Sequence, residues 1–413
     1  MSGIPLFFRL PTEWLVAFLS EWLDLPDVGK LDMAVSSKLY RPQVLVSLQD
    51  MRSTSLLSTV CYSPPKMREC WWRWMSIRQV YVESTHLTGG DVRADLPIPS
   101  LQTFTADLFC DEDLKYLVRN CPALTLLRLF SRNEDVTELG LHYIANSCLD
   151  LEYFLFSSSG EICAPTAAAL LDVLHRCSNL STVALTGSAM VGADLDEMGQ
   201  FGDLFIDLNL VIDFDEPDSI QEISDFLVEC SDLIKLELFG VNFGEFDALS
   251  FVTAQSCPLL EELGLTNWFP EALLSVISGF NLNCKLLKTL SLVSCDLLDS
   301  ILPTIAQMAN LENFSIDDCD GVTDAGIASL ARLNLVSLSI TDRFTVNEIT
   351  EECLLAFTGE ANICYTLESL SIDIGSHSII NAQKITSALA SCRNLKNLTV
   401  DWGCVRILSA VAS

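Results

Sequence analysis

The sequence predicts an α/β fold. We expect a right-handed horseshoe of stacked repeats, with parallel strands inside, helices outside, and a small helical module at the N-terminus. Three observations predict it. A short apolar phrase recurs along most of the 413 residues, helix-like segments separate its copies, and eight of the sixteen cysteines stand at one fixed place in it. Such self-similarity is the sequence signature of a solenoid.

The recurring phrase has the form apolar-x-x-apolar-x-apolar, and successive copies start 23 to 32 residues apart. This spacing is too regular over more than 300 residues to arise by chance. The thirteen copies begin at Ile77, Leu101, Leu124, Leu151, Leu180, Phe205, Leu233, Leu260, Leu287, Leu311, Leu335, Leu367 and Leu395.

Each repeat contains a strand-like and a helix-like half. The alternation in "LKTLSL" (287–292) predicts a short strand with one buried face. The segment "VTDAGIASLARL" (322–333) predicts a helix that Thr323 can cap, with Ile327 and Leu330 on one face. Strands lie about 4.8 Å apart whereas helices need about 10 Å, so the helices must take the outer side of a curve.

The cysteines predict packing rather than chemistry. The recurrent position lies three residues before the opening leucine, where we expect the helix to turn into the next strand, and a small apolar thiol fits a buried corner there. A second position, three residues beyond the last apolar strand residue, holds Cys295 and Cys319. The chain has no Cys-x-x-Cys and only four histidines, so we expect no metal and no cofactor. The first position holds Cys121, Cys148, Cys177, Cys230, Cys257, Cys284, Cys364 and Cys392.

Phrases such as "CDGVTDAGIASLARL" (319–333) and "CPALTLLRL" (121–129) resemble the cysteine-containing leucine-rich repeats. The resemblance covers roughly residues 70–404, and it implies a ribonuclease-inhibitor-like solenoid of about 13 repeats over residues 70–413. Phe205 and Leu335 depart from it because no cysteine stands three residues before them. The family serves mostly as a binding surface, so the resemblance implies protein–protein interaction.

Residues 1–52 do not join the repeat, and residues 53–69 look like a linker. The stretch "LPTEWLVAFLSEWLDLPDVGKLDMAVSSKLY" (10–40) predicts two helices, with Pro11 and Pro26 at positions that helix starts tolerate. Residues 41–51 predict a third helix. We therefore expect a small helical module ahead of the solenoid.

This module resembles an F-box, which docks its proteins onto the small adaptor of cullin-RING ubiquitin ligases. The matches are Leu10-Pro11, Glu13, Leu15, Phe18-Leu19-Ser20, Leu23, Asp27-Val28, Leu31 and Val35-Ser36. The family's tryptophan after the Val-Ser pair is missing. By resemblance the adaptor-binding residues are Leu10, Pro11, Leu15, Leu19 and Val28. Alternatively, these helices only cap the first repeat, as solenoids require.

Composition excludes several function classes. Fifty-five acidic against 24 basic residues give a net charge of −31, which repels nucleic-acid phosphates. No stretch approaches the roughly 18 apolar residues of a membrane helix, and the N-terminus does not look like a signal peptide. The expected location is therefore cytoplasmic or nuclear. The four histidines are scattered along the chain and form no catalytic pattern, so we expect that the protein is not an enzyme. They are His86, His142, His175 and His377.

The strand positions between the buried leucines are the candidate recognition surface. In the C-terminal repeats one row holds Ser291, Ser315, Ser339, Ser371 and Thr399, and the next holds Val293, Asp317, Thr341, Asp373 and Asp401. Together these rows suggest an acidic strip that binds a basic patch on a target protein; a merely solvated face is the alternative. The candidate partner-binding residues are Asp317, Asp318, Asp342, Asp373, Asp401 and Trp402.

The same rows are more apolar in earlier repeats, where exposed apolar side chains would also suit a partner. Combined with the F-box resemblance, this surface implies a non-catalytic substrate receptor of a cullin-RING ubiquitin ligase. The alternative is a leucine-rich-repeat scaffold or inhibitor. The apolar rows contain Arg128, Phe130, Leu155, Val211 and Phe239.

Overall fold

The computed structural model describes residues 31, 42, 84–88, 101–107, 110–131, 136–158, 164–190, 195–213, 223, 225–241, 257–297, 300–342, 349–357, 361–374, 387, 389–401 and 406–410. The chain divides into two compact units, residues 1–194 and 195–413. Among the described residues no helix is both long enough and apolar enough to cross a membrane. The proposed adaptor-binding residues, Trp402 and the linker at 53–69 lie outside the described residues.

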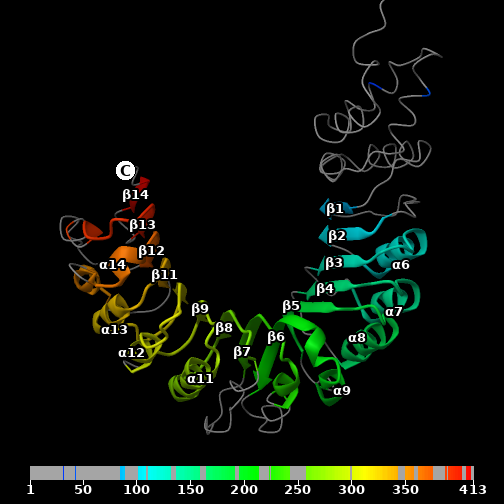
Figure 1. Ribbon diagram of the computed structural model, residues 1–413, viewed down its shortest axis with the longest axis horizontal. Coiled ribbons are helices and arrows are strands. Elements are labelled where there is room, and N and C mark those ends of the chain that lie inside the picture. Colours follow the sequence, from blue (N-terminus) through cyan, green and yellow to red (C-terminus); the bar gives the residue numbers. More distant parts are fainter. Residues whose placement is uncertain are drawn as a thin grey trace, which may run out of the picture. The chain divides into compact units, whose positions relative to one another are not determined.

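The first unit alternates strands and helices, and its strands pair in parallel in chain order. Its strands lie on one side and its helices on the other (Figure 1). Its elements are β1 (Ser84–Thr88), β2 (Thr103–Asp107), α6 (Asp111–Asn120), β3 (Leu126–Ser131), α7 (Glu138–Ser147), β4 (Tyr153–Ser158), α8 (Ala164–Arg176) and β5 (Thr182–Met190).

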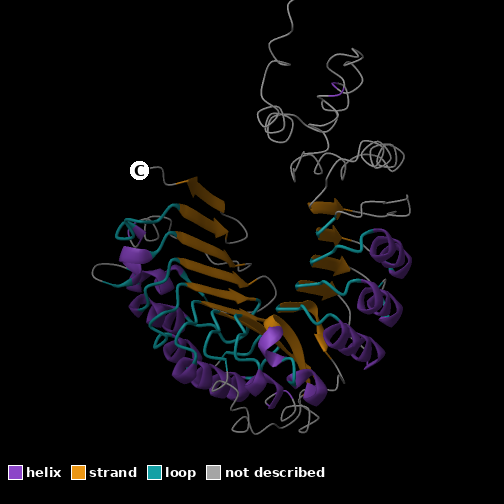
Figure 2. Ribbon diagram, turned by 45° about the vertical axis from the view of Figure 1, so that its right-hand side comes forward, coloured by secondary structure: helices purple, strands orange, loops and turns teal. Residues whose placement is uncertain are grey.

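In the second unit the strands also pair in parallel in chain order up to β13. A last strand, β14, pairs antiparallel with β13. Figure 2 shows the same two layers here, strands on one side and helices on the other. Its strands are β6 (Phe205–Asp213), β7 (Lys235–Val241), β8 (Glu262–Thr266), β9 (Thr289–Val293), β10 (Asn313–Asp317), β11 (Ser337–Asp342), β12 (Ser369–Ile374), β13 (Asn397–Asp401) and β14 (Arg406–Ala410). Its helices are α9 (Leu195–Gly199), η2 (Gly202–Leu204), α11 (Pro270–Asn283), α12 (Ile301–Ile305), α13 (Asp324–Ser329), η5 (Leu330–Arg332), η6 (Glu351–Ala356) and α14 (Ile363–Thr366).

The predicted repeat register is confirmed. Twelve of the thirteen phrases begin within the described residues, and each of those opening residues is buried. In β9, for example, Leu290 and Leu292 are fully buried while the residues between them are half-buried. Parallel strands backed by helices, joined by this leucine pattern, give the expected α/β leucine-rich-repeat class.

The cysteine position is also confirmed as a packing position. All eight cysteines there are buried, and Cys121, Cys148 and Cys284 end helices α6, α7 and α11. Their thiols connect neighbouring repeats: Cys177 Sγ donates to the Cys148 carbonyl at 3.3 Å, and Cys284 Sγ to the Cys257 carbonyl at 3.4 Å. Burial raises the pKa of Cys148 to about 12, so this thiol is protonated at neutral pH.

The helix layer is less regular than expected. The helix expected over residues 322–333 is confirmed only in part, because α13 ends at Ser329 and a 3-10 turn completes the segment. Thr323 caps α13 as expected, its hydroxyl accepting from the Gly326 amide at 3.0 Å. Cys364 lies inside the short helix α14 rather than at its end. Such short elements derive their stability from packing between repeats more than from helix propensity.

Candidate protein-binding surface

The strand face is the side of the strands that points away from the buried leucines. In the second unit the register of β6 to β13 aligns this face into three rows. The first row is Asp207, Lys235, Glu262, Thr289, Asn313, Ser337, Ser369 and Asn397; the second is Asn209, Glu237, Gly264, Ser291, Ser315, Ser339, Ser371 and Thr399; the third is Val211, Phe239, Thr266, Val293, Asp317, Thr341, Asp373 and Asp401. The two rows predicted for the C-terminal repeats are therefore confirmed as rows.

Side chains on β9 and β10 bond to each other along these rows. Ser315 Oγ donates to Ser291 Oγ at 2.9 Å, and Asn313 Nδ2 donates to Thr289 Oγ1 at 3.3 Å. All four side chains are half-buried. Cross-strand hydroxyl and amide bonds of this kind stabilise a sheet. This part of the strand face is thus a polar surface that meets many of its own hydrogen-bonding needs.

The predicted acidic residues gather at the carboxyl ends of the strands. Asp317 and Asp373 stand in the third row with Thr341 between them, and both are half-buried. Asp401 continues the row on β13. Asp342 pairs with Ile374, one position beyond the row, and the side chains of Asp342 and Asp401 lie outside the described residues.

Asp318 follows β10 in a left-handed turn with φ of 49°. Ser294 occupies the corresponding place after β9, with φ of 50°. Their amides donate to the carbonyls of Thr341 and Asp317 on the following strand, each at 2.8 Å. Aspartate adopts this backbone region more readily than most residues, so Asp318 serves the turn as well as adding charge at the edge of the strip.

The sequence analysis did not identify a group of charged side chains on β6 to β8. Lys235 Nζ lies 3.0 Å from Glu237 Oε1, and Asp207 pairs with Lys235 in the register. Asn209, opposite Glu237, is only 2% exposed. The sequence does show charged and amide residues at alternating positions of these strands. The leucine-based repeat pattern places no requirement on those positions, so it did not identify them.

The pKa values of Asp207 and Lys235 in this group differ from those of fully solvated side chains. Burial raises the pKa of Asp207 to about 6, the nearby charges of Glu237 and Glu262 add to the rise, and Lys235 opposes it. Burial lowers the pKa of Lys235, but the hydrogen bond to Glu237 and the neighbouring carboxylates raise it overall. The cluster therefore carries more negative charge than its one lysine offsets.

The strand face of the first unit differs in composition. The Arg128 guanidinium carbon lies 5.1 Å from the centre of the Tyr153 ring, in cation–π range. Phe130 and Leu155 are half-buried. In the second unit Phe239 is also half-buried, and the side chain of Val211 lies outside the described residues. The apolar patch predicted from these residues stays a prediction.

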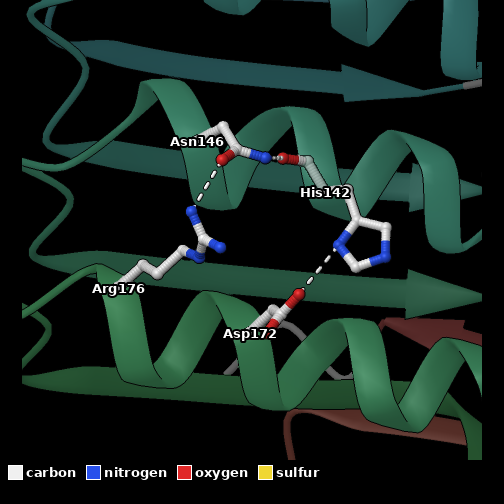
Figure 3. A network of polar contacts seen from close by, with 4 residues as sticks. All are labelled: His142, Asn146, Asp172 and Arg176. Carbon is white, nitrogen blue, oxygen red and sulfur yellow. Dashed lines mark hydrogen bonds and ion pairs between the residues drawn. The ribbon is translucent and has the colours of Figure 1, made fainter.

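The histidines lie as the sequence predicted, His142 on α7 and His175 on α8, while His377 is outside the described residues. His142 Nδ1 is 3.0 Å from Asp172 Oδ2 (Figure 3). In the same network Asn146 Nδ2 donates to the His142 carbonyl, and Arg176 Nη1 donates to Asn146 Oδ1 at 2.7 Å. Both His142 and Asp172 are half-buried, and the network ties α7 to α8 on the helix side.

A metal centre finds no support in the part of the chain that the structure describes. Within it, no group of three or more histidine, cysteine, aspartate or glutamate side chains is placed to hold an ion. The cysteines there form no disulfide and, except for Cys110, are buried. Binding through the polar strand face is the chemistry that the described residues support best.

No family model and no curated protein matches the sequence. Among solved structures, a chain from the crystal structure of the Rad7 and Elc1 complex in yeast matches with a TM-score of 0.51 and 15% identity, over 91% of this chain and 92% of that chain. An internalin, InlF, from Listeria monocytogenes matches with a TM-score of 0.43 and 13% identity, over 92% of this chain and 95% of that chain. By its fold the chain is a leucine-rich-repeat protein.

Proposed function

We propose that this chain is a non-catalytic protein-binding protein that holds its partner on the strand face. The observation that carries this proposal is the alignment of three rows of mostly polar and charged side chains along β6 to β13. Parallel stacking repeats the spacing of these side chains from strand to strand. Repeat proteins commonly use such extended surfaces for recognition.

The finer proposal is that the chain is a substrate receptor of a cullin-RING ubiquitin ligase. Residues 1–52 would dock the adaptor, residues 53–69 would link them to the solenoid, and the repeats would hold the target close to the ligase. The F-box resemblance supports this role. A further support is that a chain of similar fold has been crystallised in the Rad7 and Elc1 complex. The alternative is a scaffold or inhibitor whose N-terminal helices only cap the solenoid.

The acidic strip is proposed to receive a basic segment of the target. Asp317 and Asp373 belong to a chain with a net charge of −31, so a basic partner would be attracted over a distance. Charges at a rim act mainly on the association rate, and salt screens them. The proposed strip comprises Asp317, Asp318, Asp342, Asp373, Asp401 and Trp402.

The adaptor proposal is tested by measuring binding between the purified protein and the cullin adaptor of its own organism. The variant Leu10→Ala/Pro11→Ala removes the matching pair, and Ile4→Ala/Pro5→Ala removes a similar aliphatic-proline pair outside the resemblance. We expect the first variant to lose binding and the second to keep it. If the folded wild-type protein does not bind the adaptor, the adaptor proposal is wrong and the scaffold alternative remains.

A further inference from the structure

Two side chains of β6 bury oxygen atoms that accept no hydrogen bond. Asp207 Oδ1 and Asn209 Oδ1 are shielded from solvent and lack a donor among the residues that the structure describes. Both residues alternate with buried Leu208 and Leu210, so they share the strand face. Buried acceptors are nearly always paired in folded proteins, and one left unpaired destabilises the fold.

The described side chains on β7 do not meet this need. Glu237, directly opposite Asn209, is an acceptor when ionised and cannot donate to the amide oxygen. Lys235 is paired with Asp207 in the register, but its ammonium contacts Glu237 at 3.0 Å. Lys235 and Glu237 are each about one third exposed, at 34% and 32%, so they form the outer layer of the cluster.

The charge around the two oxygens favours a cation. Asp207, Glu237 and Glu262 together outnumber the single ammonium of Lys235, and all four electrostatically interact. Gly264 faces Glu237 across β7 and β8. A Cβ at Gly264 would lie 3.0 Å from Glu237 Cγ, so the glycine leaves room for the glutamate side chain beside the cluster.

The spacing of the acceptors distinguishes between cations. Asp207 and Asn209 are two residues apart on one face, which separates their Cα atoms by roughly 6.5 Å in a strand. A guanidinium presents five donors in a fixed plane and keeps its charge at all physiological pH values, so it can bond two separate acceptors at once. An ammonium is a compact point charge and is held less well by such a pair.

We propose that Asp207 and Asn209 form a recognition site for one arginine side chain of a protein partner. This inference rests on the proposed protein-binding role of the strand face, and it assigns a place and a chemistry to that role. Because both oxygens are shielded from solvent in the free protein, the partly exposed side chains of Lys235 and Glu237 would turn outward so that the guanidinium can donate to Asp207 Oδ1 and Asn209 Oδ1. Glu237 and Glu262 would add attraction. Lys235 would compete with the incoming cation, because its ammonium occupies the same negative field.

The proposed site is separate from the acidic strip. Its residues lie on β6 to β8, in the first two rows, whereas Asp317 and Asp373 lie in the third row on β10 and β12. Variants in the two places therefore act as controls for each other.

The experiment is a titration of isotope-labelled protein with N-acetyl-arginine methylamide, followed by the backbone resonances of β6 and β7. The citrulline analogue is the neutral control of similar shape, and the lysine analogue is the ammonium control. We expect saturable shifts at Asp207, Asn209 and Glu237 with the arginine probe, weaker shifts with lysine, and none with citrulline. Equal shifts with lysine or citrulline would overturn the assignment of a guanidinium.

Variants make the test specific. Asp207→Asn and Asn209→Leu should each weaken binding of the arginine probe about tenfold, as expected for the loss of a charge-assisted or buried hydrogen bond. Lys235→Met should strengthen binding, and Asp317→Asn should leave it unchanged. Folding of each variant is checked by circular dichroism.

The same spectra separate failure of this inference from failure of the proposed function. If an arginine-rich peptide shifts resonances of β9 to β13 but not those of β6 and β7, the arginine site is overturned while the strand face still binds. If no peptide moves any strand-face resonance, both are overturned.

Discussion

The second unit presents two kinds of polar strand face that differ in how their hydrogen bonds are met. On β9 and β10, Ser315 bonds Ser291 and Asn313 bonds Thr289. On β6, Asp207 and Asn209 each keep a buried oxygen without a donor among the described residues. Both regions share one repeat geometry and one register, so the backbone does not cause the difference.

The comparison teaches that the charge of a surface is a weaker guide to a binding site than its unmet hydrogen bonds. A polar row that satisfies itself stabilises the sheet and gains little from a partner. Buried acceptors without donors destabilise the free protein and are relieved when a partner supplies the donors. Substitutions in the core, on β6 and in the serine row test this contrast, and we expect their effects to decrease in that order.

The largest effect should come from the shared core rather than from either face. Leu290 is fully buried beneath the strand face, so Leu290→Asp buries an unpaired charge and should lower the free energy of unfolding by about 4 kcal/mol or more. Hydrogen exchange should accelerate first in β8, β9 and β10, because repeats contact mainly their neighbours. The matched control Ser291→Asp places the same charge on the half-buried opposite face and should cost much less. If hydrogen exchange instead accelerated to the same extent in all strands of both variants, the repeat register would be contradicted.

Replacing Asp207 should stabilise the protein in a pH-dependent way. Its pKa in the folded protein is raised to about 6 from 3.8, mainly by burial. A raised carboxyl pKa means that stability is greatest below pH 4 and falls as pH rises through 6, where the buried charge forms. Asp207→Asn should therefore raise the free energy of unfolding at pH 7.5 by roughly 1–2 kcal/mol, allowing for partial solvation, and change it little at pH 4. Denaturant unfolding at both pH values measures this, and an equal effect at both would refute it.

Replacing Asn209 should also stabilise the protein, but by the same amount at every pH. Asn209→Leu replaces an amide whose buried oxygen has no donor among the described residues by an apolar side chain of similar size, so the free energy of unfolding should rise by about 1 kcal/mol. The control Asn313→Leu removes a bond to Thr289 and should lower it slightly. A loss of stability in Asn209→Leu would show that its oxygen already has a donor.

The smallest effect is expected for the self-satisfied rows. Ser315→Ala removes one hydrogen bond, to Ser291 Oγ, and should lower the free energy of unfolding by about 0.5–1 kcal/mol at any pH. The arginine probe should bind this variant as it binds the wild-type protein. An altered affinity would mean that the two regions are coupled.

Much of the fold could be predicted because leucines and cysteines repeat at nearly constant spacing. That spacing identified the strands from Leu101 onward and placed Cys148, Cys177 and Cys284 at buried corners. It also predicted the serine row, which the pairing of β9 to β12 confirms. Periodicity reports which side chains face the core, and this is the quantity that sets the strand register.

The remainder depends on contacts that no local pattern reports. The antiparallel strand β14 departs from the repeat, and Asp111 accepts from both the Thr137 amide and hydroxyl of the following repeat. Asn209 follows the same alternation as the exposed residues, so its burial could not be predicted from spacing. That its Oδ1 atom lacks a donor among the described residues can be recognised only when the neighbouring strands are in place.

The most direct test of the contrast is selection of a random peptide library on three immobilised proteins. These are the wild type, the site variant Asp207→Asn/Asn209→Leu, and the serine-pair variant Ser291→Ala/Ser315→Ala, which removes the bond between those two hydroxyls. We expect arginine to be enriched at one fixed peptide position on the wild type and the serine-pair variant, and this enrichment to disappear on the site variant. Unchanged arginine enrichment on the site variant would contradict this expectation.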